Sequence, residues 1–311
     1  MTNFTSIHDT QYPTALVQQV LELKSNGHHS SLGKGKTLGL IFFNPSLRTR
    51  LSTQKAAANL GMNVIVMNIT GNAWNIEFKD GSVMNGSTQE HIKDAVQVIS
   101  GYCDVMGVRT FAKLEDPQED YQEKVLNNFI KHSSVPVVSL ESATLHPLQS
   151  LTDLATIAET GKKVPKIVLS WAPHPKKLPQ AVTNSFLQWI STTEAETTVA
   201  HPKGYELSEE FTKGVKICHD QETALTDADF VYTKNWSSYA NYGQTPPVKK
   251  DWTITEQKMK LTNNGKFMHC LPIRRNVVAT DTVIDNSLVY KQAKNREYAA
   301  QAVLQNILEE L

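Results

Sequence analysis

The segment at residues 42–50 combines residue types that bind phosphate. Its sequence, FFNPSLRTR, follows an apolar run typical of a buried strand and begins a helical pattern. The first turn of a helix offers unpaired backbone N–H groups and a partial positive charge, which suit an anion. Ser46 and Thr49 add hydroxyl donors, and Arg48 and Arg50 add guanidinium groups that can grip phosphate oxygens in pairs. A capped helix with surface arginines explains this segment, taken alone, equally well.

Two common nucleotide-binding patterns are not met. The tripeptide GKT at 35–37 resembles the end of a P-loop, but Ser30 occupies the place of that motif's first glycine. The tripeptide also precedes a predicted strand, whereas a P-loop follows one. The chain contains no GxGxxG sequence. An ATPase and a dinucleotide-binding protein are therefore excluded as readings of the sequence.

Length and composition place the chain among ordinary globular proteins. It has 311 residues, which suits two domains of about 150 residues each. Lys plus Arg and Asp plus Glu both number 31, so no net field attracts nucleic acid or an anionic membrane. Three cysteines without a CxxC pair argue against a disulfide framework and a zinc site. With no signal-peptide pattern and no apolar stretch of about 18 residues, we expect a reduced cytoplasmic protein.

Short apolar runs alternate with helical patterns along the whole chain. The predicted strands are 37–43, 64–67, 105–108, 135–140, 167–171, 197–200, 215–218, 230–233 and 267–270. The predicted helices are 47–60, 91–102, 120–132, 149–159, 179–191, 207–213, 221–227, 254–261 and the last 20 residues or so. This alternation predicts an α/β fold class: two doubly wound α/β domains with parallel sheets joined by linking helices. We expect a first domain at 1–148, to which the helix at 291–311 returns, and a second at 149–290.

The sequence SLRTR after a strand resembles the SxRTR carbamoyl-phosphate signature of the aspartate/ornithine carbamoyltransferase family. Three further segments fit that family in order and spacing: GVRT at 107–110, HPLQ at 146–149 and HCLP at 269–272. Each motif is weak alone, but the four together are specific, and the resemblance covers essentially the whole chain. It implies two α/β domains, a homotrimer, and active sites shared between neighbouring subunits.

The resemblance assigns the phosphate to the first motif. Ser46, Leu47, Arg48 and Thr49 would hold the phosphate group. Arg296, in the sequence NRE, would close the anion site from the C-terminal helix.

The other three motifs would hold the carbamoyl group. Arg109 and His146 would donate hydrogen bonds to the carbamoyl oxygen, where negative charge develops in the transition state. The side chain of Gln149 and the backbone carbonyls of Cys270 and Leu271 would orient the carbamoyl NH2 group.

Arg48, Arg109 and His146 form the predicted catalytic set. Trp74, in the loop from Gly71 to Gly86, resembles a residue that family members insert into a neighbour's site. These residue types also have ordinary structural roles: His146 could form a turn with the following proline, Arg109 a surface ion pair and Trp74 a hydrophobic anchor. Cys270 on an apolar strand favours a lining role over a nucleophilic one.

The second half departs from plain ornithine carbamoyltransferases. Those carry a Ser-Met-Gly motif and a nearby Asp for the free α-amino group. Here the proline-rich sequence WAPHPKKLPQ occupies 171–180, with Pro175 and Leu178 as predicted ligands. It resembles the loop of carbamoyltransferases that act on N-acetyl- or N-succinyl-ornithine, whose acylated nitrogen carries no charge. Prolines restrict the loop, which suits a lid over residues 171–185, with a rigid surface turn as the alternative.

Three other positions match the acyl-ornithine branch. Glu141 would contact the acylated amide or the attacking amine. Lys234 and Arg274 would pair with the α-carboxylate through charge-assisted hydrogen bonds. Both cations could instead serve as partners of surface acids.

The acyl group is addressed by two positions. Gln89 stands where the acetyl branch has Glu and the succinyl branch has Pro, and so matches neither. A Glu would repel the additional carboxylate of a succinyl group, whereas the neutral Gln89 amide could donate to it. Val278 stands where the acetyl branch has Lys. These differences favour N-succinylornithine, with N-acetylornithine as the alternative.

The sequence therefore predicts an enzyme of arginine biosynthesis that carbamoylates the δ-amine of N-succinyl-L-ornithine, giving N-succinyl-L-citrulline and phosphate. Desolvation would lower the pKa of that amine from about 10, so that its neutral form attacks, and the departing phosphate is the candidate proton acceptor. The reaction needs no metal and no organic cofactor. The predicted partners are carbamoyl phosphate and an N-acylated ornithine, without nucleic acid or membrane.

Two alternatives stay open. One is a non-catalytic anion-binding protein of the same fold, which would be expected to carry lesions in the four motifs. The other is an enzyme that carbamoylates a different amine, such as putrescine; Lys234 and Arg274 favour an acceptor with a carboxylate.

Overall fold

The chain divides into two compact units. The computed structural model describes residues 1–27, 29–69, 74–244 and 249–311. Unit 1 comprises residues 1–112, 119–148 and 296–311, and unit 2 comprises residues 113–118 and 149–295. The chain passes between them four times: between residues 112 and 113, within α4 (Pro117–Tyr121), within α6 (Pro147–Ala158) and within α12 (Val289–Leu308). The ligand that the sequence assigns to each unit stays a prediction.

Unit 1 is built on a parallel sheet of four strands in the order β2-β1-β5-β6. The strands are β1 (Thr37–Phe42), β2 (Asn63–Asn68), β5 (Val105–Arg109) and β6 (Val137–Glu141). After β2 the chain returns to the other side of β1, so β1 and β5 flank a topological switch point, where ligands bind in such sheets. The register places Phe42 beside Arg109 and Arg109 beside Glu141. The segments that follow these three strands therefore leave the same edge of the sheet.

The helices of unit 1 bury an apolar core against this sheet. They are α1 (Pro13–Asn26), α2 (Leu47–Asn59), α3 (Ile92–Ser100) and α5 (Lys124–His132), with the short η1 (Ile7–Asp9) and α4 (Pro117–Tyr121). Side chains of α3 and α5, including Val96 and Phe129, pack with Ile41 and Met106 of the strands. Removing this apolar surface from water supplies the main driving force for the layer. Helix α1, which the sequence analysis did not predict, starts with Pro13 and ends at Gly27 in the left-handed conformation.

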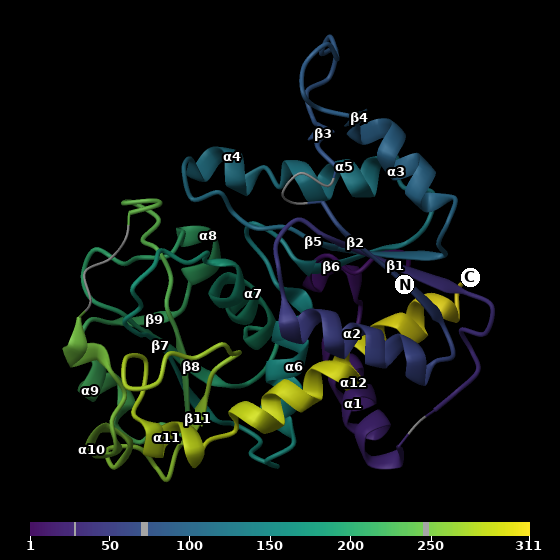
Figure 1. Cartoon of the computed structure of the whole chain (residues 1–311). Helices are drawn as coiled ribbons and strands as arrows, with labels where there is room; N and C mark the ends of the chain where they lie inside the picture. Colours follow the sequence, from purple (N-terminus) through teal and green to yellow (C-terminus); the bar gives the residue numbers. More distant parts are fainter. Residues whose placement is uncertain (28, 70–73, 245–248) are drawn as a thin grey trace. The chain divides into compact units, whose positions relative to one another are not determined.

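An arm extends from unit 1 between β2 and α3. Its two short strands, β3 (Ile76–Glu77) and β4 (Glu90–His91), pair in parallel. Figure 1 shows the segment between them projecting away from the four-stranded sheet. The start of the loop predicted from Gly71 lies outside the described residues, which resume at Trp74.

Unit 2 is built on a parallel sheet of five strands in the order β11-β10-β7-β8-β9. The strands are β7 (Lys166–Trp171), β8 (Glu196–Ala200), β9 (Lys216–Cys218), β10 (Phe230–Lys234) and β11 (Lys266–Met268). Here β7 and β10 flank the switch point, because β8 and β9 lie on one side of β7 and β10 and β11 on the other. Both sheets confirm the predicted doubly wound parallel α/β fold.

An aromatic cluster fills the core of unit 2. Trp171, at the end of β7, packs its ring 4.8 Å from that of Tyr205 and edge-on against Trp252. Its indole nitrogen donates to the Trp236 carbonyl at 3.1 Å, so the polar tip of this buried ring is satisfied. The helices of the unit are α7 (Ala181–Ile190), α8 (Glu209–Thr212), α9 (Gln221–Leu225), η2 (Lys250–Trp252), α10 (Glu256–Met259) and α11 (Asp281–Asp285). Among the described residues of the whole chain, no helix is long and apolar enough to cross a membrane.

Candidate active site

The first turn of α2 has the geometry of an anion site. Ser46 occupies the N-cap position with an extended backbone, at φ −151° and ψ 125°, and its side chain makes no capping hydrogen bond. The backbone N–H groups of the first turn thus have no cap from the Ser46 side chain. They lie at the switch point between β1 and β5. The Leu47 side chain is 66% exposed, so its N–H group is what this residue offers to an anion.

Two buried arginines converge on the same turn. Arg296, on α12, donates from Nη2 to the Thr49 hydroxyl at 2.7 Å, and Arg109, at the end of β5, lies 3.4 Å from that hydroxyl through Nη1. All three side chains are buried. The Glu141 carboxylate pairs with Arg109, and the two guanidinium groups still gather positive charge beside the first turn of α2. The arrangement is therefore suited to an anionic ligand.

Arg109 is held in place by Glu141 and an aromatic ring. Its Nη1 lies 2.6 Å from Oε2 of Glu141, and its guanidinium carbon lies 4.5 Å from the centre of the Phe111 ring. The Nε2 atom of His146 lies 3.6 Å from the same carboxylate oxygen. Within the described residues, the buried Nε of Arg109 has no hydrogen-bond partner. Such a donor is rare in a protein interior and is expected where a ligand completes the site.

The two arginines of the SLRTR motif are not equivalent. Arg48 is half-buried at the first turn of α2. Arg50 donates to the side-chain oxygen of Asn68 and stacks over the Phe42 ring, with 4.6 Å between its guanidinium carbon and the ring centre. These contacts hold Arg50 against β1 and β2, and phosphate binding by either arginine stays a prediction.

The C-terminal helix is fastened along α2, which positions Arg296. The Asn59 amide at the end of α2 donates to Glu297 at 3.0 Å and to Gln301 at 2.9 Å. Figure 1 shows α2 crossing α12, and the contacts lie in the middle of α12. The buried Asn59 bonds fix the register of the two helices, so that Arg296 reaches Thr49 at the opposite end of α2.

The arm brings two predicted ligands together. The Trp74 ring is 44% exposed, and its nitrogen donates to Glu90 at 2.8 Å. Gln89 forms a reciprocal pair with Asn75: its side-chain oxygen accepts from the Asn75 N–H at 2.7 Å, and its own N–H donates to the Asn75 carbonyl at 2.9 Å. These contacts order the arm and direct the Gln89 amide oxygen back onto it.

In unit 2, three basic side chains meet at the switch point between β7 and β10. Lys234 ends β10, and Arg274 donates from Nε to Nε2 of His174 at 3.4 Å. Burial lowers the pKa of His174, and the positive charges of Lys234 and Arg274 lower it further, although a hydrogen bond to the Lys176 carbonyl acts against them. A neutral His174 that accepts from Arg274 completes a cluster suited to carboxylates. His174 was not among the ligands predicted from the sequence.

The proline-rich loop is fastened at both ends and is shorter than the predicted lid over 171–185, whose closure stays a prediction. Trp171 belongs to β7 and residues 181–185 to α7, so the irregular part is 172–180. Its start donates from the Ala172 N–H to the Lys234 carbonyl at 3.1 Å, and its end accepts at the Leu178 carbonyl from the Ser237 N–H at 3.0 Å. Buried amides reinforce both ends: Asn235 donates to the Ala172 carbonyl, and Gln180 donates to the Ser237 carbonyl. Pro175 is exposed at the tip.

The remaining predicted ligands of unit 2 lie on a buried polar network. Gln149 donates to Asp153 at 2.6 Å, and Gln292 donates to the same carboxylate oxygen at 2.7 Å. Gln292 also accepts from the His269 N–H, next to Cys270. Leu271 adopts a left-handed backbone with φ 55°, and its N–H group donates to the His269 ring at 2.9 Å. Strained backbone of this kind gathers at functional sites, where it aims carbonyl groups.

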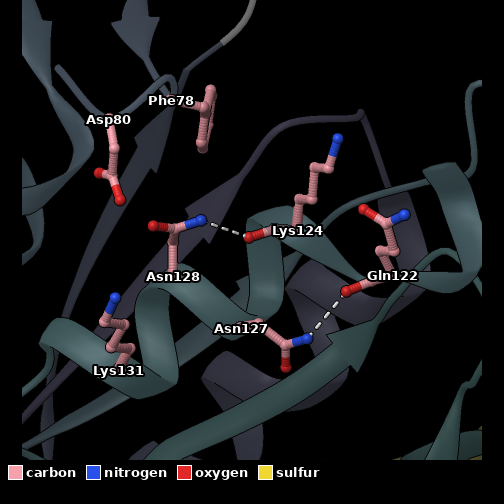
Figure 2. Close-up of a pocket in the computed structure, with 7 residues that line it drawn as sticks. All are labelled: Phe78, Asp80, Gln122, Lys124, Asn127, Asn128 and Lys131. Atoms are coloured by element: carbon pink, nitrogen blue, oxygen red, sulfur yellow. Dashed lines mark hydrogen bonds between the residues drawn. The ribbon is translucent and has the colours of Figure 1, made fainter.

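One cavity lies apart from these residues. A cavity of about 440 Å³ in unit 1 is lined by Phe78, Asp80, Gln122, Lys124, Asn127, Asn128 and Lys131 (Figure 2). It contains none of the predicted site residues. Over the ranges that the structure describes, no group of three or more His, Cys, Asp or Glu side chains is placed to hold a metal ion.

Comparison with known proteins identifies both halves of the chain. Residues 3–159 match the model for "Aspartate/ornithine carbamoyltransferase, carbamoyl-P binding domain", and residues 179–307 match the model for its "Asp/Orn binding domain". The N-succinylornithine carbamoyltransferase of Bacteroides thetaiotaomicron is 48% identical over 100% of both chains. The N-acetylornithine carbamoyltransferase of Xanthomonas campestris pv. campestris is 38% identical over 93% of this chain and 92% of the relative.

Solved structures agree with these matches. A mutant N-acetyl-L-ornithine transcarbamylase in complex with carbamyl phosphate and N-succinyl-L-norvaline superposes with a TM-score of 0.93 at 35% identity, covering 99% of this chain and 100% of that one. An acetylornithine transcarbamylase in complex with acetylcitrulline gives the same TM-score, with 99% of each chain covered.

Proposed function

This chain belongs to the aspartate/ornithine carbamoyltransferase family, and we propose that it transfers the carbamoyl group of carbamoyl phosphate to the δ-amine of N-succinyl-L-ornithine. The products are N-succinyl-L-citrulline and phosphate, as in arginine biosynthesis. The observation that carries the proposal is the convergence of Arg109 and Arg296 on Thr49, at the first turn of α2.

Carbamoyl phosphate is the donor that fits unit 1. The N–H groups of the α2 turn, the Ser46 and Thr49 hydroxyls, Arg48 and Arg296 bind the phosphate group. Arg109 and His146 face the carbamoyl oxygen from the adjacent strand ends. Both donors are held before the substrate arrives, so little reorganisation is needed when negative charge develops on that oxygen.

The reaction forms one bond and breaks one. The neutral δ-amine attacks the carbamoyl carbon, and a C–N bond replaces the C–O bond to phosphate. The amine loses one proton, which the departing phosphate accepts. Arg109 and His146 stabilise the oxygen of the tetrahedral intermediate, and Arg48 and Arg296 stabilise the phosphate as it gains charge.

The cationic cluster of unit 2 is the proposed acceptor site. Lys234, Arg274 and His174 bind carboxylate, and Pro175 and Leu178 shape the loop beside them. The greater identity to a succinylornithine enzyme than to an acetylornithine enzyme supports the succinyl compound. Gln89 also supports it, because an uncharged amide does not repel the succinyl carboxylate. Gln149 and the carbonyls of Cys270 and Leu271 orient the carbamoyl NH2 group.

The arm accounts for a shared site. Trp74 precedes β3 of the arm and is 44% exposed, which supports a contact with a neighbouring copy of the chain. We propose a cytoplasmic homotrimer in which Trp74 and Gln89 complete the site of a neighbouring subunit, as the family resemblance implies.

A panel of acceptors tests the proposed function. Purified protein with carbamoyl phosphate is expected to form an ureido product with N-succinyl-L-ornithine, and much less with N-acetyl-L-ornithine or free ornithine. Turnover of the acetyl compound alone would replace the proposed acceptor. Turnover of free ornithine would contradict the assignment of the proline-rich loop, and no turnover of any acceptor would favour the anion-binding protein.

Arg274→Met is expected to raise the KM for N-succinyl-L-ornithine by about 10- to 100-fold, because charge-assisted hydrogen bonds contribute roughly 1.5–3 kcal/mol. The KM for carbamoyl phosphate should stay within about threefold. Steady-state kinetics with each substrate varied in turn measures both. Arg275→Met is the matched control, because Arg275 pairs with Asp281 and Asp285 at the surface instead. An equal rise in KM for both variants would contradict the assignment of Arg274.

A further inference from the structure

The loop between Glu141 and His146 surrounds the carboxyl group of Glu123, which lies just before α5. Oε1 of Glu123 accepts from the Ser142 hydroxyl at 2.6 Å and from the N–H and hydroxyl of Thr144 at 2.7 and 2.5 Å. Its Oε2 accepts from the Ala143 N–H at 3.1 Å. Four donors from three consecutive loop residues thus meet a single charged side chain.

These hydrogen bonds gather on a carboxyl group, and the donors lie on a buried loop. Ser142, Ala143 and Thr144 are all buried, so leaving their donors without the Glu123 carboxyl group would be costly. The loop adds a hydrogen bond of its own, from the Ser142 N–H to the Leu145 carbonyl at 2.8 Å. The backbone path from Glu141 to His146 is therefore fixed on both sides.

Glu123 is itself held rigidly. It precedes α5 with a left-handed backbone, at φ 50° and ψ 37°. Its N–H group donates to the Asp120 carbonyl at 3.1 Å, and its carbonyl accepts from the Asn127 N–H at 2.9 Å. Figure 2 shows the Asn127 side chain reaching back to the Gln122 carbonyl, a bond of 2.9 Å that closes the same turn. A left-handed non-glycine residue persists only where its surroundings determine it, and such sites gather near functional groups.

We propose that Glu123 is a positioning residue for carbamoyl transfer: it sets the placement of Glu141 and His146 by holding the loop between them. Only four residues, 142–145, separate the two side chains, so a displaced loop displaces both. Glu141 in turn anchors Arg109 at 2.6 Å. Misplacing catalytic groups by about 1 Å can slow a reaction about 100-fold. This inference rests on the proposed function, although Glu123 does not touch the substrate.

Glu123→Ala tests the proposal. The kcat per folded molecule is expected to fall about 100-fold, while the KM for carbamoyl phosphate changes by less than about threefold. Glu123→Gln should recover part of that kcat, because its amide oxygen can still accept from Ser142 and Thr144, whereas its NH2 group cannot accept from the Ala143 N–H. Glu119→Gln is the matched control: Glu119 precedes the same turn, its side chain is 57% exposed, and kcat should not change. Circular dichroism at the assay temperature gives the folded fraction.

A spectroscopic measurement separates this proposal from the proposed function. The ring resonances of His146, identified by their loss in His146→Asn, are expected to shift in Glu123→Ala and to stay in place in Glu119→Gln. This readout holds even if the wild-type protein turns over none of the acceptors, in which case the proposed function fails on its own. If Glu123→Ala does not fold, Thr144→Val removes one of the four donors and should lower kcat about tenfold and shift the same resonances. Unshifted His146 resonances, or a folded variant with wild-type kcat, would overturn the positioning role.

Discussion

Arg48→Ala is expected to abolish measurable turnover while leaving the protein almost as stable as the wild type. Arg48 sits at the first turn of α2, where the phosphate of carbamoyl phosphate is proposed to bind. Losing one preorganised donor to developing charge slows catalysis about 100- to 1,000-fold, and a cation at the phosphate also supports substrate binding. A half-buried side chain at a helix start contributes little to folding, so the free energy of unfolding should fall by less than about 1 kcal/mol. Product formation at saturating acceptor and urea denaturation measure the two quantities.

Arg50→Ala supplies the comparison within the same motif. Arg50 is bound by Asn68 and stacked on Phe42, so its loss should change kcat by only a fewfold. Near wild-type activity of Arg48→Ala, or a larger loss in Arg50→Ala, would mean that the phosphate binds elsewhere.

Arg109→Ala is expected to damage both activity and stability. The variant loses the proposed donor to the carbamoyl oxygen, so kcat should fall at least 100-fold. It also leaves the Glu141 carboxylate buried without the guanidinium that lies 2.6 Å from it. Breaking a buried ion pair on one side costs about 3–5 kcal/mol of folding free energy. Denaturant unfolding of the variant should show a loss of that order.

Replacing both partners separates the two effects. The double variant Arg109→Met with Glu141→Leu removes the buried charges together, so most of the lost stability should return. Its activity should remain as low as that of Arg109→Ala, because the donor is still missing. If the double variant is no more stable than the single one, the Arg109–Glu141 pair does not explain the loss.

The sequence predicts the fold well because both sheets are parallel. Buried strands such as β1 and β7 appear as short apolar runs separated by helical patterns, and the ends of most elements lie within a few residues of the predicted ones. Helix α1 was not predicted, although Pro13 and Gly27 mark its two ends. The arm strands are two residues each, too short for a period to be visible.

The site is only partly visible in the sequence. Motifs identify Thr49, Arg109 and Arg296, but their meeting at one hydroxyl depends on the winding of the sheet and on the register of two helices. His174 was missed because its partner Arg274 lies 100 residues away. Glu123 belongs to no motif. Its proposed role depends on a left-handed backbone conformation that the sequence does not predict.

The attachments of the proline-rich loop could not be predicted, for a physical reason. Prolines suggested a restricted loop, but the amides that fasten it, Asn235 and Gln180, bond to backbone carbonyls across the switch point. Side-chain to backbone hydrogen bonds of this kind have no sequence periodicity. The identity of the loop was therefore easier to predict than its attachment.

The central claim is best tested by following the carbamoyl carbon itself. Carbamoyl phosphate labelled with 13C and N-succinyl-L-ornithine labelled with 15N at the δ-amine are incubated with the wild-type protein, and the 13C spectrum is recorded over time. The account predicts that the carbamoyl phosphate signal is replaced by a ureido carbon split by one-bond coupling to the δ-nitrogen. Decay of carbamoyl phosphate at the rate seen without protein, with no coupled ureido signal, would contradict it.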